Sequence, residues 1–180
     1  MTGLLDLVAH WNVHAHSPKE LGDADVVIAH EFGDQKVPSD TTKAIINTAV
    51  TLCARYNLPL ICQFPGDQVA CARGVNPLYV VRENIARPGT YLDTHEVNRQ
   101  AALECAKYGW KKVILVSHRH HLWRAGENIK KRHHLMPLFP KETACIPYDP
   151  KCSRILLRQP LLFIPREIWS RWSYRKQGLI

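Results

Sequence analysis

The stretch Val113-Ile-Leu-Val-Ser-His-Arg-His-His-Leu-Trp-Arg-Ala125 joins a short apolar run to a polar turn and then to a segment of helical character. Because the run is short, β-branched and bounded by polar residues, it predicts a buried strand from Lys111 to Ser117. The residues from Arg124 to about Arg132 are predicted to form the helix that follows. In an open α/β sheet, ligands bind where strands end and helices begin. The stretch therefore indicates both the fold class and the place where a functional site is expected.

The same alternation of short apolar runs and longer helical patterns continues along the chain. Further strands are predicted over 23–30, 58–64, 78–82 and 144–148, with an irregular loop over 133–143. Helices are predicted from Ser39 or Asp40 to about Tyr56, from Asp93 to about Tyr108, and over 166–176 after Pro165. Asp93 and Glu96 have the spacing of a capping box, and Gly109 is placed to end that helix in a left-handed conformation.

Strands that alternate with helices of this length favour parallel pairing, with the crossover helices on both faces of the sheet. The predicted fold class is therefore a Rossmann-like three-layer α/β domain with a mainly parallel sheet of about five strands. The 180 residues fit a single domain. Within it, 1–16 and 160–180 are expected to form terminal helical segments.

Composition narrows the class of protein further. Apolar residues make up 46% of the chain, which is ordinary for a soluble globular protein, and no run of about 18 of them predicts a transmembrane helix. The first residues carry no basic leader and Asp6 interrupts their apolar stretch, so a cytoplasmic protein is expected. The six cysteines form no C-x-x-C pair, which favours reduced thiols over a disulfide or zinc framework.

The net charge of +8 is unevenly distributed along the chain. Residues 111–180 hold 15 Lys and Arg against 4 Asp and Glu, whereas residues 1–110 hold 9 against 12. Such a basic half could face nucleic acid, an anionic membrane surface or an acidic ligand, or it could be a solvated surface. The basic and aromatic segment 163–176 is compatible with an interfacial helix, although such a stripe more often docks on the sheet.

The carboxyl ends of parallel strands meet at one edge of the sheet, where the chemically active side chains are expected to gather. His121 and His118 are candidates for acid–base catalysis, because imidazole titrates near neutral pH, with Glu83 or Asp67 as partner. Arg124 and the helix start after Ser117 are suited to hold a phosphate or carboxylate. The expected ligand-binding residues at this edge are His30, Glu31, Gly33, Asp67, Thr94, Glu96, Ser117 and Arg124.

Several familiar kinds of site are disfavoured. The histidines of 118–121 and the pair His133-His134 supply metal-binding groups, but they lack any fixed ligand spacing, so no metal site is expected. Ser117 directly precedes His118, and neighbouring strand residues point to opposite faces, which argues against a hydrolase triad. Neither a G-x-G-x-x-G dinucleotide motif nor a phosphate-binding P-loop is present.

Four motifs form a pattern between Ala24 and about Arg132, most clearly over 91–130. They are a strand led by Asp25-Val-Val-Ile, Glu83 after the third strand, Thr94, Glu96 and Asn98 opening a helix, and His121-Leu-Trp-Arg124-Ala125. Together they resemble the YdcF-like family, a domain of unknown function that also includes SanA and ElyC. The tail Pro160-Leu-Leu-Phe-Ile-Pro-Arg-Glu-Ile is similar to family tails as well.

Two turns depart from the family pattern. Family members usually carry a Gly-Gly turn after the first strand and often Ser-Gly-Gly after the second, where this chain has His30-Glu-Phe-Gly33 and Phe64-Pro-Gly-Asp67. The membrane anchor typical of the SanA and ElyC branches is missing, so a soluble YdcF-like form is the closer comparison. The resemblance implies a bacterial protein with a Rossmann-like fold, Asn98 among the ligand-binding residues, and a nucleotide-like ligand, with S-adenosylmethionine as a candidate cofactor.

Three functions remain open on these grounds. The first is a binding domain for a small anionic or nucleotide-like molecule, held by Arg124 and the helix start. The second is a hydrolase or transferase acting on a phosphorylated or envelope-precursor substrate, with His121 or His118 as acid–base group. The third is a basic interaction module for nucleic acid or a membrane surface, in which binding would weaken steeply with salt.

Overall fold

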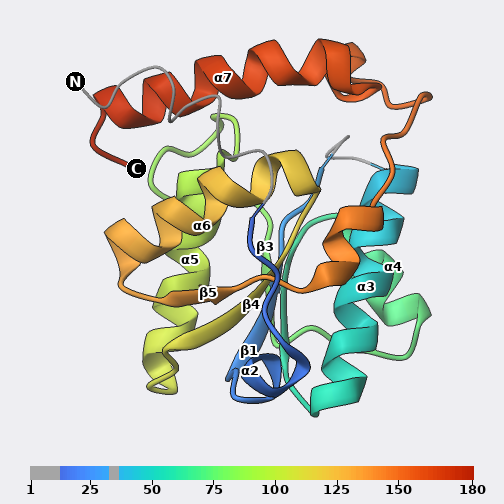
Figure 1. Ribbon diagram of the computed structural model, residues 1–180, viewed down its shortest axis with the longest axis vertical. Helices are drawn as coiled ribbons and strands as arrows, with labels where there is room; N and C mark the ends of the chain where they lie inside the picture. The colour runs from blue at the N-terminus through green and yellow to red at the C-terminus, as the bar shows by residue number, and fades with distance from the viewer. Residues whose placement is uncertain (1–12, 33–36) are drawn as a thin grey trace.

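A five-stranded parallel sheet forms the centre of the computed structural model, which describes residues 13–32 and 37–180. Its strand order is β3-β2-β1-β4-β5, and helices cover both faces (Figure 1). The strands are β1 (Val26–Ala29), β2 (Leu60–Gln63), β3 (Tyr79–Val81), β4 (Lys112–Val116) and β5 (Met136–Leu138). The predicted Rossmann-like three-layer α/β fold is confirmed.

The helices lie in two layers around this sheet, with one helix crossing its end. They are α2 (Pro18–Gly22), α3 (Asp40–Tyr56), α4 (Gly66–Ala72), α5 (Thr94–Lys107), α6 (Arg119–His133) and α7 (Pro160–Lys176). Helices α3 and α4 cover one face, and α5 and α6 cover the other (Figure 1). Helix α7 packs on α6 and on the short 3-10 helix η2 (Ile155–Leu157), and it crosses the carboxyl edge of the sheet.

Successive side chains of a strand point to opposite faces of the sheet, which explains why helices cover both faces. In β1, Val27 packs with Ile46 of α3, whereas its neighbour Ile28 packs with Leu122 of α6 on the opposite face. All four side chains are fully buried. Burial of each such aliphatic side chain contributes roughly 1.5–3 kcal/mol, and β1, which is covered on both faces, is accordingly apolar at all four positions.

Several helices begin or end at the capping residues that the sequence predicted. The Ser39 hydroxyl accepts a hydrogen bond from the Thr42 amide at 3.1 Å and caps α3, and Asp93 caps α5 by accepting from the Glu96 amide at 2.9 Å. Gly109 follows α5 with φ of 71°, the left-handed conformation expected there. Gly66 is required for a different reason, because a Cβ at this position would lie 2.7 Å from Ile46 Cδ1.

Glu96 does not complete the predicted capping box. Its carboxylate instead accepts from the backbone amides of Ile85 and Ala86 and pairs with Arg99 at 2.6 Å. The hydrogen bonds from Arg99, against the opposing effect of burial, lower the pKa of Glu96 to about 2. This carboxylate therefore fixes the loop after β3 to α5.

Two predicted elements of the second half were wrong in position. The fifth strand lies at 136–138, within the predicted loop, while 144–148 contains the end of the 3-10 helix η1 (Lys141–Cys145) and irregular backbone. Pro137 argues against a strand at this position in the sequence. The proline is tolerated because β5 is an edge strand that pairs with β4 alone.

Three helical boundaries also differ from the prediction. Helix α6 begins at Arg119 instead of Arg124, because His118 caps it, with its ring nitrogen accepting from the His120 amide. Helix α7 begins at Pro160 and contains Pro165. Of the predicted terminal helix over 1–16, residues 13–16 have no helical structure and the rest lie outside the described residues.

Candidate functional site

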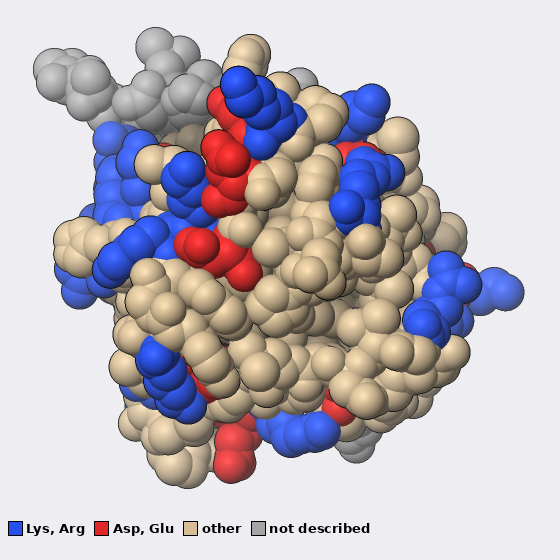
Figure 2. All heavy atoms as spheres, turned by 90° about the horizontal axis from the view of Figure 1, so that it is seen from below, with Lys and Arg blue, Asp and Glu red and all other residues tan. Residues whose placement is uncertain are grey.

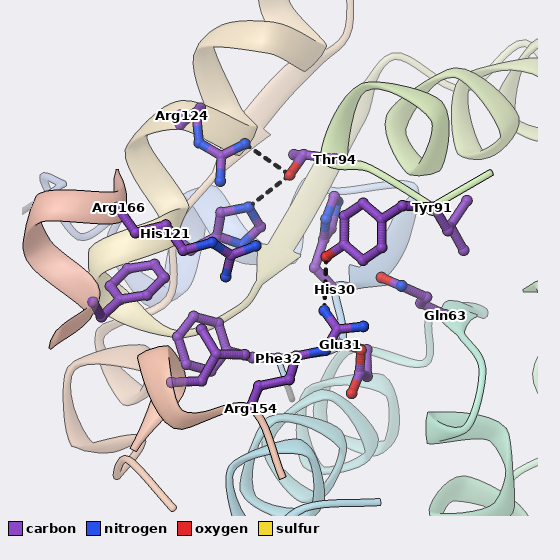
Figure 3. Close-up of a pocket in the computed structure, with 13 residues that line it drawn as sticks. His30, Glu31, Phe32, Gln63, Tyr91, Thr94, His121, Arg124, Arg154 and Arg166 are labelled. Carbon is purple, nitrogen blue, oxygen red and sulfur yellow. Dashed lines mark hydrogen bonds between the residues drawn. The ribbon is translucent and has the colours of Figure 1, made fainter. Parts of the chain in front are cut away.

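A small cavity of about 50 Å³ lies at the carboxyl edge of the sheet, beneath α7 (Figure 3). Its floor comes from residues at the ends of β1 and β2, and its sides come from the first turns of α5 and α6. The segment 154–166 closes it from above. The lining residues are His30, Glu31, Phe32, Gln63, Tyr91, Leu92, Thr94, His121, Arg124, Arg154, Leu157, Phe163 and Arg166.

One wall of the cavity is a continuous chain of polar side chains. Nδ1 of His121 lies 3.0 Å from the hydroxyl of Ser117, and its Nε2 lies 2.9 Å from the hydroxyl of Thr94. Nη1 of Arg124 donates to the same Thr94 oxygen at 2.9 Å. Because a neutral imidazole donates through one ring nitrogen and accepts through the other, the two hydroxyls hold the ring in a fixed orientation. Figure 3 shows Thr94 joined to both partners.

Arg124 belongs to a buried ion cluster that ties α7 to α6. Its Nε and Nη2 donate to the two carboxylate oxygens of Glu167, each at 3.0 Å, and Arg171 donates to the same carboxylate at 3.3 Å. Glu167 and Arg171 are completely buried. Burial opposes the charge of Arg124, but the ion pair with Glu167 outweighs it and raises the pKa of the guanidinium. Arg124 is therefore charged, oriented and only partly available to a ligand.

Two further arginines line the cavity without a carboxylate partner. Among the described residues, no Asp or Glu forms an ion pair with Arg154 or Arg166. Arg154 donates to the Tyr91 hydroxyl at 3.0 Å, and Arg166 extends toward the ring of His121 (Figure 3). Among the described residues that line the cavity, Glu31 is the single acidic side chain, against three arginines. The lining therefore carries an excess of positive charge.

The two histidines of the cavity are neutral at physiological pH. Burial, together with the charge of Arg124, lowers the pKa of His121 well below its ordinary value of 6.5. Burial likewise lowers the pKa of His30 to about 4. Nε2 of His30 is buried without a hydrogen-bond partner in the described chain. A neutral imidazole in this setting is suited to hydrogen bonding and is a weak proton acceptor.

The structure brings five of the predicted site residues to the cavity: His30, Glu31, Thr94, His121 and Arg124. Ser117 stands directly behind them as the partner of His121. Ser117 pairs with His121, one helical turn further along, and not with its sequence neighbour His118. These residues were predictable because each lies directly after a strand or in the first two turns of the helix that follows one.

The remaining predicted residues lie elsewhere. His118 is sandwiched against Phe32 and Tyr148, with ring centroids 4.6 and 4.1 Å away, and does not line the cavity. Asp67 pairs with Arg82 at 2.6 Å.

Three more of them face away from the cavity or stand behind it. Glu83 is exposed and only its backbone carbonyl is engaged, by the Gln100 side chain. Asn98 donates to the Ala125 carbonyl and to Asn128. Glu96 fixes the loop described above, and Gly33 lies outside the described residues.

The helix start of α6 does not contribute the binding surface that the sequence suggested. Ser117, His118 and Arg119 all fail to line the cavity, and the α6 residues that do so, His121 and Arg124, act through their side chains. The residues that sequence reasoning missed are Arg154, Arg166 and Glu167. Only the basic character of this segment was visible in the sequence, because no local pattern shows that the segment returns over the sheet.

Comparisons with known proteins give no assignment: no protein-family model, no curated protein and no solved structure matches this chain. Within 13–32 and 37–180, no three His, Cys, Asp or Glu side chains are grouped so that they could hold a metal ion. None of the described helices has the length and apolar character needed to cross a bilayer.

Proposed function

We propose that this protein binds the oxyanion end of a small ligand, a phosphate or carboxylate group, in the cavity beneath α7. The observation that carries the proposal is the presence of three arginines around one small cavity, two of them without a carboxylate partner. Arg166 and Arg154 supply charge-assisted hydrogen bonds, and Arg124 adds its remaining N–H groups from a position fixed by Glu167. Thr94 and His30 offer further polar groups to the bound anion.

The size of the cavity supports a compact anion. A single water needs roughly 10–15 Å³ of such space, so about 50 Å³ suits a group of a few heavy atoms. A whole nucleotide or S-adenosylmethionine exceeds this volume, and the arginines disfavour a sulfonium cation. Only the anionic end of a nucleotide-like ligand would therefore occupy the cavity.

The resemblance to the YdcF-like family is part of this proposal. Of the motifs on which it rests, Thr94, His121 and Arg124 line the cavity and are joined by hydrogen bonds. A shared ligand-binding role for these three residues in the family is consistent with that arrangement. Of the two turns that differ from the family pattern, the one after β1 supplies His30, Glu31 and Phe32 to the cavity, and we expect it to alter which ligand is accepted.

Inorganic phosphate titrated by calorimetry tests the proposal. Arg166→Gln should weaken binding about ten- to hundredfold, since a hydrogen bond to a charged group contributes roughly 1.5–3 kcal/mol. Arg73→Gln removes the same charge from an exposed residue outside the cavity and should leave the affinity unchanged. Absence of phosphate binding to the wild-type protein, or equal affinity of the two variants, would exclude the proposal.

Catalysis is the second candidate, favoured by one observation. The Thr94 hydroxyl and Nε2 of His121 are 2.9 Å apart, which is the separation of a nucleophile and its base. Hydrolase or transferase chemistry on a phosphorylated substrate would use this pair. The lowered pKa of His121 makes it a weak base, so binding takes precedence. Turnover of a simple phosphomonoester that is lost in Thr94→Val would support catalysis, whereas a rate equal to buffer alone would leave binding as the function.

The third candidate, a basic interaction module, rests on the net positive charge of residues 111–180. Figure 2 shows the opposite side of the molecule from α7, at the amino ends of the strands, where basic and acidic side chains are interspersed around a mostly uncharged centre. That face lacks the continuous positive field that nucleic acid or anionic lipid would need.

A further inference from the structure

A second hollow adjoins the cavity and opens to solvent. Its volume is about 470 Å³, roughly ten times that of the cavity. Three residues line both spaces: Tyr91, Arg154 and Arg166. The remaining lining consists of Ser153, Ile155 and Leu156, the latter two from η2. We call this hollow the η2 groove.

The η2 groove is aliphatic at its far side and positive only where it meets the cavity. Ile155 and Leu156 are 60% and 48% exposed, which is unusual for large aliphatic side chains placed next to one another. Their neighbour Leu157 points the other way, is buried and lines the cavity. Ile155 and Leu156 of η2 therefore present apolar surface to the groove, while Leu157 closes the anion site.

Tyr91 and Arg154 form the boundary between the two spaces. The guanidinium of Arg154 lies over the Tyr91 ring, 5.0 Å from its centroid, and donates to its hydroxyl at 3.0 Å (Figure 3). A ligand whose anion sits beside Arg166 would thus continue over this pair into the groove. None of the described residues that line the groove is a carboxylate or a side-chain amide, the groups that commonly recognise the edge of a base, so the groove fits an apolar chain better than a nucleobase.

From these observations we infer that the ligand is an anionic amphiphile, with its phosphate or carboxylate head in the cavity and an aliphatic chain in the η2 groove. The inference rests on the proposed anion site and adds the chemistry of the rest of the ligand. The cavity is too small for more than the head, and the adjoining η2 groove, which shares three lining residues with it, is mainly apolar.

Calorimetric titration with n-alkyl phosphates tests this inference. The series runs from ethyl to octyl phosphate, each kept below its critical micelle concentration. Affinity should rise about two- to fourfold with each added methylene, since full burial of a CH₂ group gives at most about fourfold. The rise should stop once the chain is longer than the groove. Adenosine monophosphate should bind no more tightly than the shortest alkyl phosphate.

Paired variants separate the two spaces. The double variant Ile155→Ser, Leu156→Ser should abolish the dependence on chain length while inorganic phosphate binds as in the wild type. Leu103→Ser replaces an equally exposed leucine on α5, outside the groove, and should leave the series unchanged. Because all three side chains are largely exposed, we expect each variant to fold.

The outcomes distinguish this inference from the anion site itself. Phosphate binding that depends on Arg166 but shows no chain-length dependence would overturn the amphiphile and leave the anion site standing. Tighter binding of adenosine monophosphate than of hexyl phosphate would overturn it in favour of a nucleotide. Chain-length dependence that octanol reproduces, or an affinity for hexyl phosphate that is unchanged in Arg166→Gln, would show adsorption without the head group and would overturn it too. Loss of all phosphate binding in the wild type would remove the anion site on which it rests.

Discussion

Mild acid is expected to unfold this protein because three histidines are buried in neutral form. His30, His118 and His121 are 1%, 0% and 6% exposed. Burial lowers the pKa of His30 to about 4 and that of His118 to about 3, and it lowers the pKa of His121 well below 6.5. In the unfolded chain each imidazole titrates near pH 6.5. Between these values the unfolded state binds more protons than the native state, so stability must fall as the pH falls.

The size of the stability loss follows from the difference between the pKa values of the histidines in the native and unfolded states. At pH 5 an unfolded histidine is about 1.5 pH units below its pKa, which stabilises the unfolded state by roughly 2 kcal/mol for each native histidine that stays neutral. Three such residues amount to about 6 kcal/mol between pH 7 and pH 5. A domain of this size has a net stability of about 5–15 kcal/mol, so much of it should be lost.

Urea unfolding followed by tryptophan fluorescence at pH 7, 6 and 5 measures the effect. His118→Asn removes one titrating group and keeps a residue that is favourable at the N-cap of α6. The acid-induced loss should shrink by roughly 2 kcal/mol in this variant, whatever its stability at pH 7. His134→Asn changes an exposed histidine in a left-handed C-cap that Asn also favours, and should leave the pH dependence unchanged.

Two results would refute the reasoning. The first is a free energy of unfolding that is flat between pH 7 and pH 5 in the wild type. The second is a pH dependence in His118→Asn that equals that of the wild type and of His134→Asn, because the buried ring would then contribute no proton uptake on unfolding.

Three further perturbations test the packing around the site. Glu167→Gln should cost about 3–5 kcal/mol in urea unfolding, because it leaves two buried guanidinium groups without their shared carboxylate. Gly126→Ala should destabilise by about 1–3 kcal/mol, since the new Cβ would lie 2.6 Å from Cζ of Phe139. With a thiol reagent, Cys71 and Cys145 should react at once and the four buried thiols only on unfolding, because all six are free and only these two are exposed.

Each of these three predictions has a result that would contradict it. Glu127→Gln, which removes the partner of Lys131 on the surface of α6, should change the urea midpoint little, and an equal effect of both glutamine variants would contradict the buried cluster. An unchanged midpoint in Gly126→Ala would mean that α6 and Phe139 are not in close contact. Rapid reaction of Cys62 or Cys105 would contradict their burial, which raises the pKa of both thiols to about 12.

The sequence predicted the part of the site that is local and missed the part that depends on long-range packing. Thr94 and His121 were placed correctly at the sheet edge because a strand end and a helix start determine where they lie. Arg154 and Arg166 belong to a segment whose return over that edge depends on the buried pairing of Glu167. No local pattern encodes such a pairing.

The misplaced fifth strand has a comparable cause. Met136–Leu138 is only three residues long and contains a proline, so its local pattern is that of a turn. Its strand character comes from β4, whose backbone it pairs with at the sheet edge. Ala144–Tyr148 has a more apolar pattern, but it packs against α3, where the Thr41 hydroxyl donates to the Pro147 carbonyl, and it does not join the sheet.

The position of Glu167 on a late segment has a consequence for synthesis. Arg124 leaves the ribosome 43 residues before the carboxylate that neutralises it, a delay of about 2–9 s at ordinary translation speeds. During that interval all five strands have been made, yet the guanidinium at their edge has no counter-ion and must remain hydrated. The nascent chain can thus assemble its sheet early, while the cavity at the sheet edge closes only after α7 emerges.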